Sequence, residues 1–352
     1  MRGRTRRTTI PTETPPPAPD LRPPAEGPGE GAPIPVFEIA DEAEHRVLAR
    51  WRRNVGAPVA LDLAPPAPAG VRELDLLSWN LKVGAAHLDR LLGRLREGAH
   101  GGAGTDPGRP LVLLVQEAYR ADDTVPERAP EPGFAGGDLT PPRPEDLVDV
   151  ARRHGLSLRY APSMRNGAAR SDRGNAVLAT AALGRAHAFA LLYVRQRRVA
   201  VGARLAGVEG VDVVSAHLDT HRRLWDGDSP RRGLGGARAH QAERLAEAVV
   251  RRDAPGGVVL AGDFNTPLGE RDPAHRAMVG AGLLPARRRW DWKHTHHGLV
   301  RFLLDHVLYH PGGGRIASVE VQRLDEHPRD RGPAVFGSDH HPLLARVALG
   351  GG

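Results

Sequence analysis

Residues 260–267 read LAGDFNTP and follow the short apolar run GGVV at 256–259. The apolar residues predict a buried strand, and Pro267 ends it because proline cannot donate a hydrogen bond to a sheet. Asp263 and Asn265 then stand two positions apart at the strand exit, and two readings are open. They form a turn, because Asp and Asn readily bond to their own backbone, or they reach one ligand together, because alternate side chains of a strand share a face. The residues at the ends of the other predicted strands distinguish a turn from a ligand site.

Other apolar runs also carry polar side chains at their ends. ELDLLSWN at 73–80 ends on Asn80, and LVLLVQE at 111–117 ends on Gln116 and Glu117. Three later runs are GVDVVSAHLD at 210–219, FLLDHVLYH at 302–310 and GSDHHPLLARVAL at 337–349, with the polar residues His217, Asp219, Asp305, Asp339 and His340. Binding and catalytic residues gather at the ends of rigid elements, so we expect these side chains to line one common rim.

The composition limits the class of protein. The chain has 352 residues, 40% of them hydrophobic, which is enough for one large core or two modest ones. No run approaches the ~18 apolar residues of a membrane span. The start, MRGRTRRTTIPTETPPP, is basic but has Thr, Glu and Pro where an export signal needs apolar residues, so we expect a cytoplasmic protein. We also expect a monomer. The lack of cysteine excludes disulfides, thiolate nucleophiles and Cys-based zinc sites.

The chain divides into a tail and a body. Residues 1–70 are rich in Pro, Gly and Arg, and we expect a largely disordered tail because such a composition buries little apolar surface. Apolar spacing predicts a helix within it at 36–53. Residues 71–352 predict one domain of strands and helices, with the helices at 87–97, 145–154 and 236–252. The net charge of +7 lies entirely in this body, because residues 1–70 hold nine Arg and nine acidic residues.

Seven motifs in this order resemble the endonuclease/exonuclease/phosphatase superfamily, the DNase I-like fold. They are SWN (78–80), QE (116–117), RGNAVLA (173–179), SAHLD (215–219), GDFN (262–265), LDH (304–306) and SDHHP (338–342). The resemblance covers roughly residues 72–349. It implies an α/β (α+β) fold, a four-layer αββα sandwich of two mainly antiparallel sheets flanked by helices, with the site along one rim.

The resemblance also implies a metal site. Phosphodiester hydrolysis needs a cation on the phosphate oxygens, a positioned water and proton transfer. Mg²⁺ prefers oxygen ligands, so we expect Glu117 as the main ligand, Asn80 beside it, and Asp339 as a third or second-site ligand. The alternative for Glu117 is a solvated carboxylate at a strand end.

The family pattern further assigns catalytic roles. His217 and His340 are the acid/base residues, because imidazole exchanges protons near neutral pH. Asp305 of LDH orients His340, whereas Asp172 or Asp219 orients His217 and the sequence does not choose between them. Asp263 orients or activates the attacking water, and Asn265 donates to a phosphoryl oxygen.

Other features carry weaker signals. We place Asn175 with the substrate-binding residues, although Gly-Asn is also ordinary turn chemistry. Arg222 and Arg223 follow His217 in a Gly-rich loop and are expected to bind a polyanion, the alternative being a solvated face. Arg165 and Asn166 contact substrate or form a solvated loop. HTHH at 294–297 suggests a zinc site, but no fourth ligand stands at a suitable spacing, and a lining of the cleft is the alternative.

The sequence therefore predicts a phosphoesterase that uses Mg²⁺ or Mn²⁺, and a nuclease, because a basic body suits nucleic acid. The alternative is a sphingomyelinase-like or inositol-phosphate phosphoesterase, because the fold and motifs do not distinguish these substrates. Lipid action normally needs an exposed apolar loop, which the sequence does not show clearly. A non-catalytic binding module would leave gaps among the catalytic positions, and none is missing.

Overall fold

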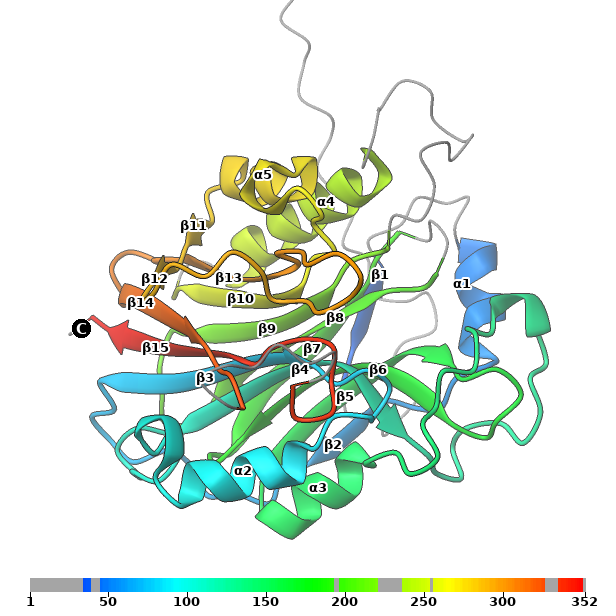
Figure 1. Cartoon of the computed structure of the whole chain (residues 1–352), viewed down its shortest axis with the longest axis horizontal. Coiled ribbons are helices and arrows are strands. Elements are labelled where there is room, and N and C mark those ends of the chain that lie inside the picture. Colours follow the sequence, from blue (N-terminus) through cyan, green and yellow to red (C-terminus); the bar gives the residue numbers. More distant parts are fainter. Residues whose placement is uncertain are drawn as a thin grey trace, which may run out of the picture.

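The computed structural model describes residues 34–38, 45–192, 196–220, 236–253, 256–326 and 335–350. Two β-sheets lie face to face, and helices cover both outer faces (Figure 1). The predicted αββα sandwich is therefore confirmed, and most neighbouring strands within each sheet run antiparallel.

The first sheet has seven strands. In spatial order they are β1 (Val36–Glu38), β7 (Leu183–Ala190), β8 (Val199–Leu205), β9 (Asp212–His217), β10 (Val258–Asp263), β13 (Asp305–His310) and β11 (Leu284–Pro285). Only the pairs β1/β7 and β9/β10 are parallel among its described strands.

The second sheet has eight strands. In spatial order they are β12 (Arg287–Arg288), β14 (Ile316–Arg323), β15 (Leu343–Leu349), β3 (Glu73–Asn80), β4 (Leu111–Arg120), β6 (Asp172–Ala179), β5 (Ser157–Arg165) and β2 (Val59–Leu61). Here the described parallel pairs are β12/β14 and β3/β4.

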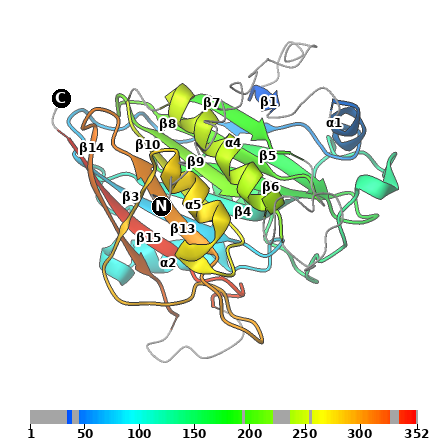
Figure 2. The same ribbon diagram turned by 90° about the horizontal axis from the view of Figure 1, so that it is seen from above.

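Two helix layers cover the sheets, as the two views show (Figures 1 and 2). The α-helices are α1 (His45–Arg52), α2 (Leu88–Arg96), α3 (Leu147–His154), α4 (Gly236–Asp253) and α5 (Pro273–Gly280), and short 3-10 turns occupy Ala99–Gly101, Pro132–Phe134 and Gly269–Arg271. Helices α2 and α3 pack on the second sheet, and α4 and α5 pack on the first. The three predicted helices of the body are confirmed as α2, α3 and α4, while the sequence pattern did not predict α5.

The central strands are apolar on both faces because each lies between a sheet and a helix layer. In β3, Leu74 and Leu76 enter the core between the sheets, whereas Leu77 and Trp79 face the helices. Strand β10 follows the same rule, with alternate residues in the central core and under α4. Alternation of side chains along a buried strand produces this division.

The N-terminal segment packs on the body, which corrects the predicted tail and helix. Val36–Glu38 pairs with β7 as a strand, and the helix begins only at His45. Pairing with a sheet edge has overridden the local helical spacing, because Phe37 packs on Phe189 with ring centroids 6.1 Å apart. Within the range 1–70, α1 and β2 also join the body. Residues 1–33 lie outside the described residues.

Among the described residues, no helix combines the length and apolar character needed to cross a membrane.

Substitutions at two tryptophans, one buried and one exposed, test the packing of α1. Trp51 is 3% exposed and its indole N–H donates to Ser163 O at 2.6 Å. We expect Trp51→Ala to lower the free energy of unfolding by about 3–5 kcal/mol, because it leaves a large cavity. Trp290→Ala is the control, because Trp290 is 61% exposed and its loss should cost less than about 0.5 kcal/mol. Urea unfolding followed by circular dichroism measures both, and equal small effects would show that α1 is not docked.

Candidate active site

The predicted site residues come together because their strands end at one rim. Asp263, the last residue of β10, pairs with His217 at the end of β9 and with Asp305 at the start of β13. Gly262 makes the close approach possible, because its φ is 153° and a Cβ there would lie 1.8 Å from a backbone oxygen of β9. In the other sheet, Asn80 pairs with Gln116 at the same rim.

Asp263 is the centre of the polar network. Its Oδ2 accepts a hydrogen bond from Asn80 Nδ2 at 3.0 Å and lies 3.4 Å from His217 Nε2 and 3.8 Å from His340 Nε2. Its Oδ1 accepts from Asn265 N at 2.9 Å. Burial raises the pKa of Asp263 to about 7, although the charge of His340 lowers it. The carboxyl can therefore exchange a proton near neutral pH.

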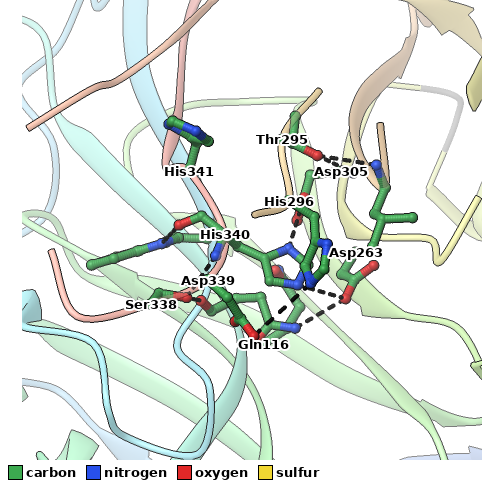
Figure 3. A network of polar contacts seen from close by, with 12 residues as sticks. Gln116, Asp263, Thr295, His296, Asp305, Ser338, Asp339, His340 and His341 are labelled. Carbon is green, nitrogen blue, oxygen red and sulfur yellow. Dashed lines mark hydrogen bonds and ion pairs between the residues drawn. The ribbon is translucent and has the colours of Figure 1, made fainter. Parts of the chain in front are cut away.

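His340 is held on several sides (Figure 3). Its Nδ1 lies 2.8 Å from Asp305 Oδ2, its backbone N donates to Ser338 Oγ at 3.1 Å, and its backbone O accepts from Trp79 Nε1 at 2.9 Å. Burial lowers the pKa of His340, but the charges of Asp305 and then Asp263 outweigh it and raise the pKa to about 10. The ring is therefore a cation at neutral pH. The predicted contact between Asp305 and His340 is present.

Thr295 and His296 border this pair, and the sequence did not single out either as a site residue. Thr295 Oγ1 accepts from the backbone N of Asp305 at 3.0 Å and so fixes the start of β13. His296 lies edge-on to His340, with ring centroids 4.9 Å apart, and its Nε2 is 3.9 Å from Asp339 Oδ2 (Figure 3). Both residues belong to the HTHH segment, which was read only as a zinc site or a lining of the cleft.

His217 has a different environment from the predicted one. Its Nδ1 lies 3.0 Å from Arg198 Nη1, and its Nε2 lies 3.0 Å from Asn265 Nδ2. Arginine only donates, so Nδ1 accepts and the ring proton sits on Nε2, where its acceptor is Asp263 Oδ2 at 3.4 Å, because the Asn265 amide nitrogen is itself a donor. Burial lowers the pKa of His217 well below its usual value, and the charge of Arg198 lowers it further. His217 is therefore neutral where His340 is charged.

Neither predicted carboxylate orients His217, which corrects that part of the sequence reading. Asp172 accepts hydrogen bonds from Arg120 and from the Tyr160 hydroxyl at 2.6 Å, so its charge is used in a buried ion pair. Asp219 accepts from the backbone N of Gln196 at 3.2 Å. Arg198 contacts His217 Nδ1 instead, and the sequence did not predict this contact. The one feature of the sequence that could have indicated it is the pair of arginines at 197–198, directly before a strand.

Glu117 is placed by its backbone. The register of β4 against β6 shifts between Val115 and Ala118, and Glu117 inside this bulge has a φ of 49°. Non-glycine residues rarely adopt this left-handed conformation, and such strain gathers at functional sites. The side chain is 20% exposed, with Oε1 at 3.8 Å from Arg198 Nη1 and 4.0 Å from His217 Nδ1. The bulge therefore aims a carboxylate at the rim.

The donor set at the rim fits a hard divalent cation. Glu117 offers a partly exposed carboxylate, and Asn80 offers an amide oxygen on the neighbouring strand end, which accepts from Lys82 N at 2.9 Å. Carboxylate and amide oxygens are ligands that Mg²⁺ and Mn²⁺ accept. Asp339 instead faces Lys82, with Oδ2 at 3.3 Å from Nζ, so its ion pairs join it to Lys82 and His296 rather than to the other predicted ligands.

A second set of ligand-type atoms includes His340, which the sequence predicted as an acid/base residue. Atoms of Asp263, Asp305 and His340 lie within 4.8 Å of one another. Asp305 and His340 are hydrogen-bonded to each other, which is how a carboxylate fixes the tautomer of a catalytic imidazole.

The weaker predictions fare differently. Asn175 is buried and donates to Val199 O at 2.8 Å, so its amide ties β6 to β8 across the two sheets. Arg165 is buried as well and donates to backbone oxygens such as Pro126 O at 2.6 Å, so it is not a solvated loop residue. Arg222 and Arg223 lie outside the described residues.

The comparisons with known proteins agree with this geometry. Residues 77–340 match the model of the Endonuclease/Exonuclease/phosphatase family. An endonuclease/exonuclease/phosphatase family protein from Leptotrichia buccalis is 15% identical, with a TM-score of 0.50, over 78% of this chain and 99% of its own. A mannosyl-6-phosphatase from Bacteroides thetaiotaomicron is 14% identical, with a TM-score of 0.51, over 78% of this chain and 100% of its own. A search of curated proteins finds no match.

The chain thus belongs to the endonuclease/exonuclease/phosphatase family, because the family match covers most of its length. Members of this family are hydrolases that act on phosphoester bonds and generally depend on a divalent metal. At these low identities the solved structures add the fold alone.

The role of Glu117 as a metal ligand is testable by replacing its carboxylate with a neutral amide of the same shape. We expect Glu117→Gln to keep the fold and to lower metal-dependent turnover about a thousandfold or more, because it removes the charge that anchors the cation. Glu127→Gln is the matched control, since Glu127 is exposed. Steady-state rates with Mg²⁺ or Mn²⁺ and the urea midpoint measure the two effects. Wild-type turnover in Glu117→Gln would remove Glu117 from the metal site.

Proposed function

We propose that this chain hydrolyses phosphodiester bonds of nucleic acid with the help of Mg²⁺ or Mn²⁺. The observation that carries the proposal is the position of the Asp263 carboxylate between two imidazoles, 3.4 Å from His217 Nε2 and 3.8 Å from His340 Nε2. The His340 ring is charged and the Asp263 carboxyl has a pKa of about 7, so the site offers a base and a cationic donor side by side.

Each residue has a role in the proposed reaction. Glu117 and Asn80 hold the divalent cation, which supplies charge stabilisation at the phosphoryl oxygens when bound. Asp263 accepts a proton from the attacking water, because its pKa of about 7 lets it do so at neutral pH. His340 donates its Nε2 proton to the leaving oxygen as the P–O bond breaks, since Asp305 engages its Nδ1.

The remaining polar groups orient these residues. His217 presents Nε2–H toward the same place, since Arg198 engages its Nδ1. Asn265, in the left-handed conformation with a φ of 50°, places its amide against His217 Nε2 and Leu218 O. A phosphoryl oxygen beside the ring would be within reach of this amide.

Charge supports nucleic acid as the substrate. The excess of +7 lies wholly outside residues 1–70, and two buried arginines stand near Glu117. Arg198 Nη1 is 3.8 Å from Glu117 Oε1, and the charge of Glu117 acts to raise the pKa of Arg173, although burial lowers it more. Fixed cations beside a metal site suit a polyanion.

A lipid phosphodiester is the second candidate, because the structure shows an exposed apolar segment. Trp290 is 61% exposed, Leu299 is fully exposed and Val300 is 58% exposed. These side chains flank Thr295 and His296, which contact the acid/base pair. The sequence did not show this loop, because exposure of single apolar residues has no pattern of its own.

The pH dependence follows from the two shifted groups. Turnover should rise as Asp263 ionises through about pH 7 and fall as His340 loses its proton near pH 10. Asp305→Asn removes a negative charge that raises the pKa of His340, so the alkaline limb should move to lower pH by about one unit or more. Asp291→Asn, an exposed residue of a nearby loop, is the control. An alkaline limb unmoved by Asp305→Asn would exclude His340 as the titrating group.

The substrate class is tested by a screen and by salt. Duplex DNA, single strands, RNA, sphingomyelin and inositol phosphates are compared at low salt with Mg²⁺ and with Mn²⁺. For nucleic acid, binding should fall with salt at a log–log slope of about −0.9 per neutralised phosphate on duplex and about −0.7 on single strands. Arg222→Ala combined with Arg223→Ala should make the slope less steep by the amount that up to about two phosphate contacts contribute.

The control for this pair is Arg152→Ala with Arg153→Ala. These exposed residues precede β5, which begins at the opposite end of the sheet from Glu117. The opposite outcome would replace the nuclease proposal with the lipid one. In that case the wild type cleaves sphingomyelin but no nucleic acid, and the combined Trp290→Ala and Leu299→Ala variant loses this turnover.

A further inference from the structure

A second cluster of histidines lies behind the acid/base pair. It consists of His294, His297 and His341, whose ring nitrogens come within 4.8 Å of one another. His297 and His341 are buried, and His294 is partly exposed, which leaves a way in from solvent. Figure 3 shows the ring of His341 apart from the neighbouring His340 and turned away from Asp263.

Backbone pairing explains why adjacent histidines face different sites. His296 and His340 form an antiparallel bridge, His297 N donates to Asp339 O at 2.6 Å, and His341 N donates to Thr295 O at 2.8 Å. Successive side chains of paired extended segments point to opposite faces. His296 and His340 therefore face the phosphoester site, whereas His297 and His341 face the second cluster.

The hydrogen bonds of His341 orient its ring as those of a metal ligand are oriented. Its Nδ1 lies 2.8 Å from Asp325 Oδ1 and 3.0 Å from Leu324 O, so Nδ1 carries the proton. Its Nε2 therefore presents a lone pair, and it points at Nε2 of His297, with which it is in direct contact. Ligating imidazoles characteristically donate their other N–H to a carboxylate or a backbone oxygen.

Two features of the surroundings bear on the charge of the cluster. Arg323 Nη1 donates to His294 Nε2 at 3.2 Å, so this nitrogen holds the lone pair of the ring and becomes a metal ligand when the guanidinium turns away from it. Arg323 Nε also lies 3.1 Å from Asp325 Oδ1, so this carboxylate balances the guanidinium. A hydrogen bond between two neutral rings would account for His297 and His341, but it gives no role to the third imidazole beside them, with centroids 5.3 and 5.7 Å away.

We propose that His294, His297 and His341 bind a transition-metal ion such as Zn²⁺, with water as the fourth ligand. Three imidazoles suit Zn²⁺ and its neighbours, whereas Mg²⁺ prefers oxygen, so the two sites select different metals. The ion would tie the segment of Thr295, which fixes Asp305, to the segment of His340. This site thereby stabilises the two segments that carry Thr295 and His340 and takes no part in the proposed hydrolysis.

Co²⁺ is the spectroscopic probe for this site. The full chain is stripped with a chelator and titrated with Co²⁺ in excess Mg²⁺, which fills the oxygen site. We expect visible d–d absorption that saturates at about one equivalent and is displaced by Zn²⁺. His294→Ala should weaken binding about tenfold or more, and Asp325→Asn about 10- to 100-fold, because each removes a ligand or its orienting partner. His240→Ala, a partly exposed histidine on α4, is the control.

A thermal measurement keeps the test independent of the probe. Zn²⁺ should raise the melting temperature of the wild type and of His240→Ala, and should do so much less in His294→Ala. No Co²⁺ absorption and no Zn²⁺-dependent shift in the wild type would overturn the proposal and leave a simple hydrogen bond between two rings. A Co²⁺ signal lost in His340→Ala but kept in His294→Ala would assign the ion to the acid/base group and overturn it equally.

Discussion

The hydrogen bond from Asn80 to Asp263 joins the last residue of β3 to the last residue of β10, and so joins the two sheets at the rim. Adjoining contacts depend on the same few residues, because Ser338 donates to the backbone oxygen of Asn80 and Trp79 donates to that of His340. All of these groups are buried, where an unpaired polar atom costs about 1–3 kcal/mol. The positions of Asn80 and Asp263 are therefore set by the stacking of the sheets, and the segment before β15 is tied to the same rim by Ser338 and His340.

The same burial shifts the pKa values of Asp263, His340 and His217 away from their usual values. Asp263 is shifted upward because its charge is poorly solvated, and His340 is shifted upward because two carboxylates outweigh that penalty. His217 has Arg198 as its neighbour and is shifted the other way. Environment alone thus leaves one imidazole neutral and the other positively charged within one network, which is a general way for a site to hold groups in different protonation states at one pH.

The sequence predicted those parts that depend on local pattern. Buried strands such as β3 and β10 are visible as apolar runs, and polar residues at their ends predicted the rim because the register of neighbouring strands aligns those ends. Contacts that depend on distant segments were not predictable: Arg198 on Nδ1 of His217, Thr295 on the start of β13, and the ion pair of Asp172. The left-handed backbone of Glu117 also has no signature, because it arises from a shift in pairing between β4 and β6.

The exposed segment around residues 290–300 has a bearing on how such a scaffold diversifies. Its anchors, Thr295 and His296, are bound to the rim, while Trp290, Leu299 and Val300 project into solvent and contribute little to the core. Substitutions at the projecting positions meet few packing constraints, so they can accumulate without disturbing the reacting groups. For protein engineering, these three positions are the natural place to graft a new recognition surface while the polar rim is left unchanged.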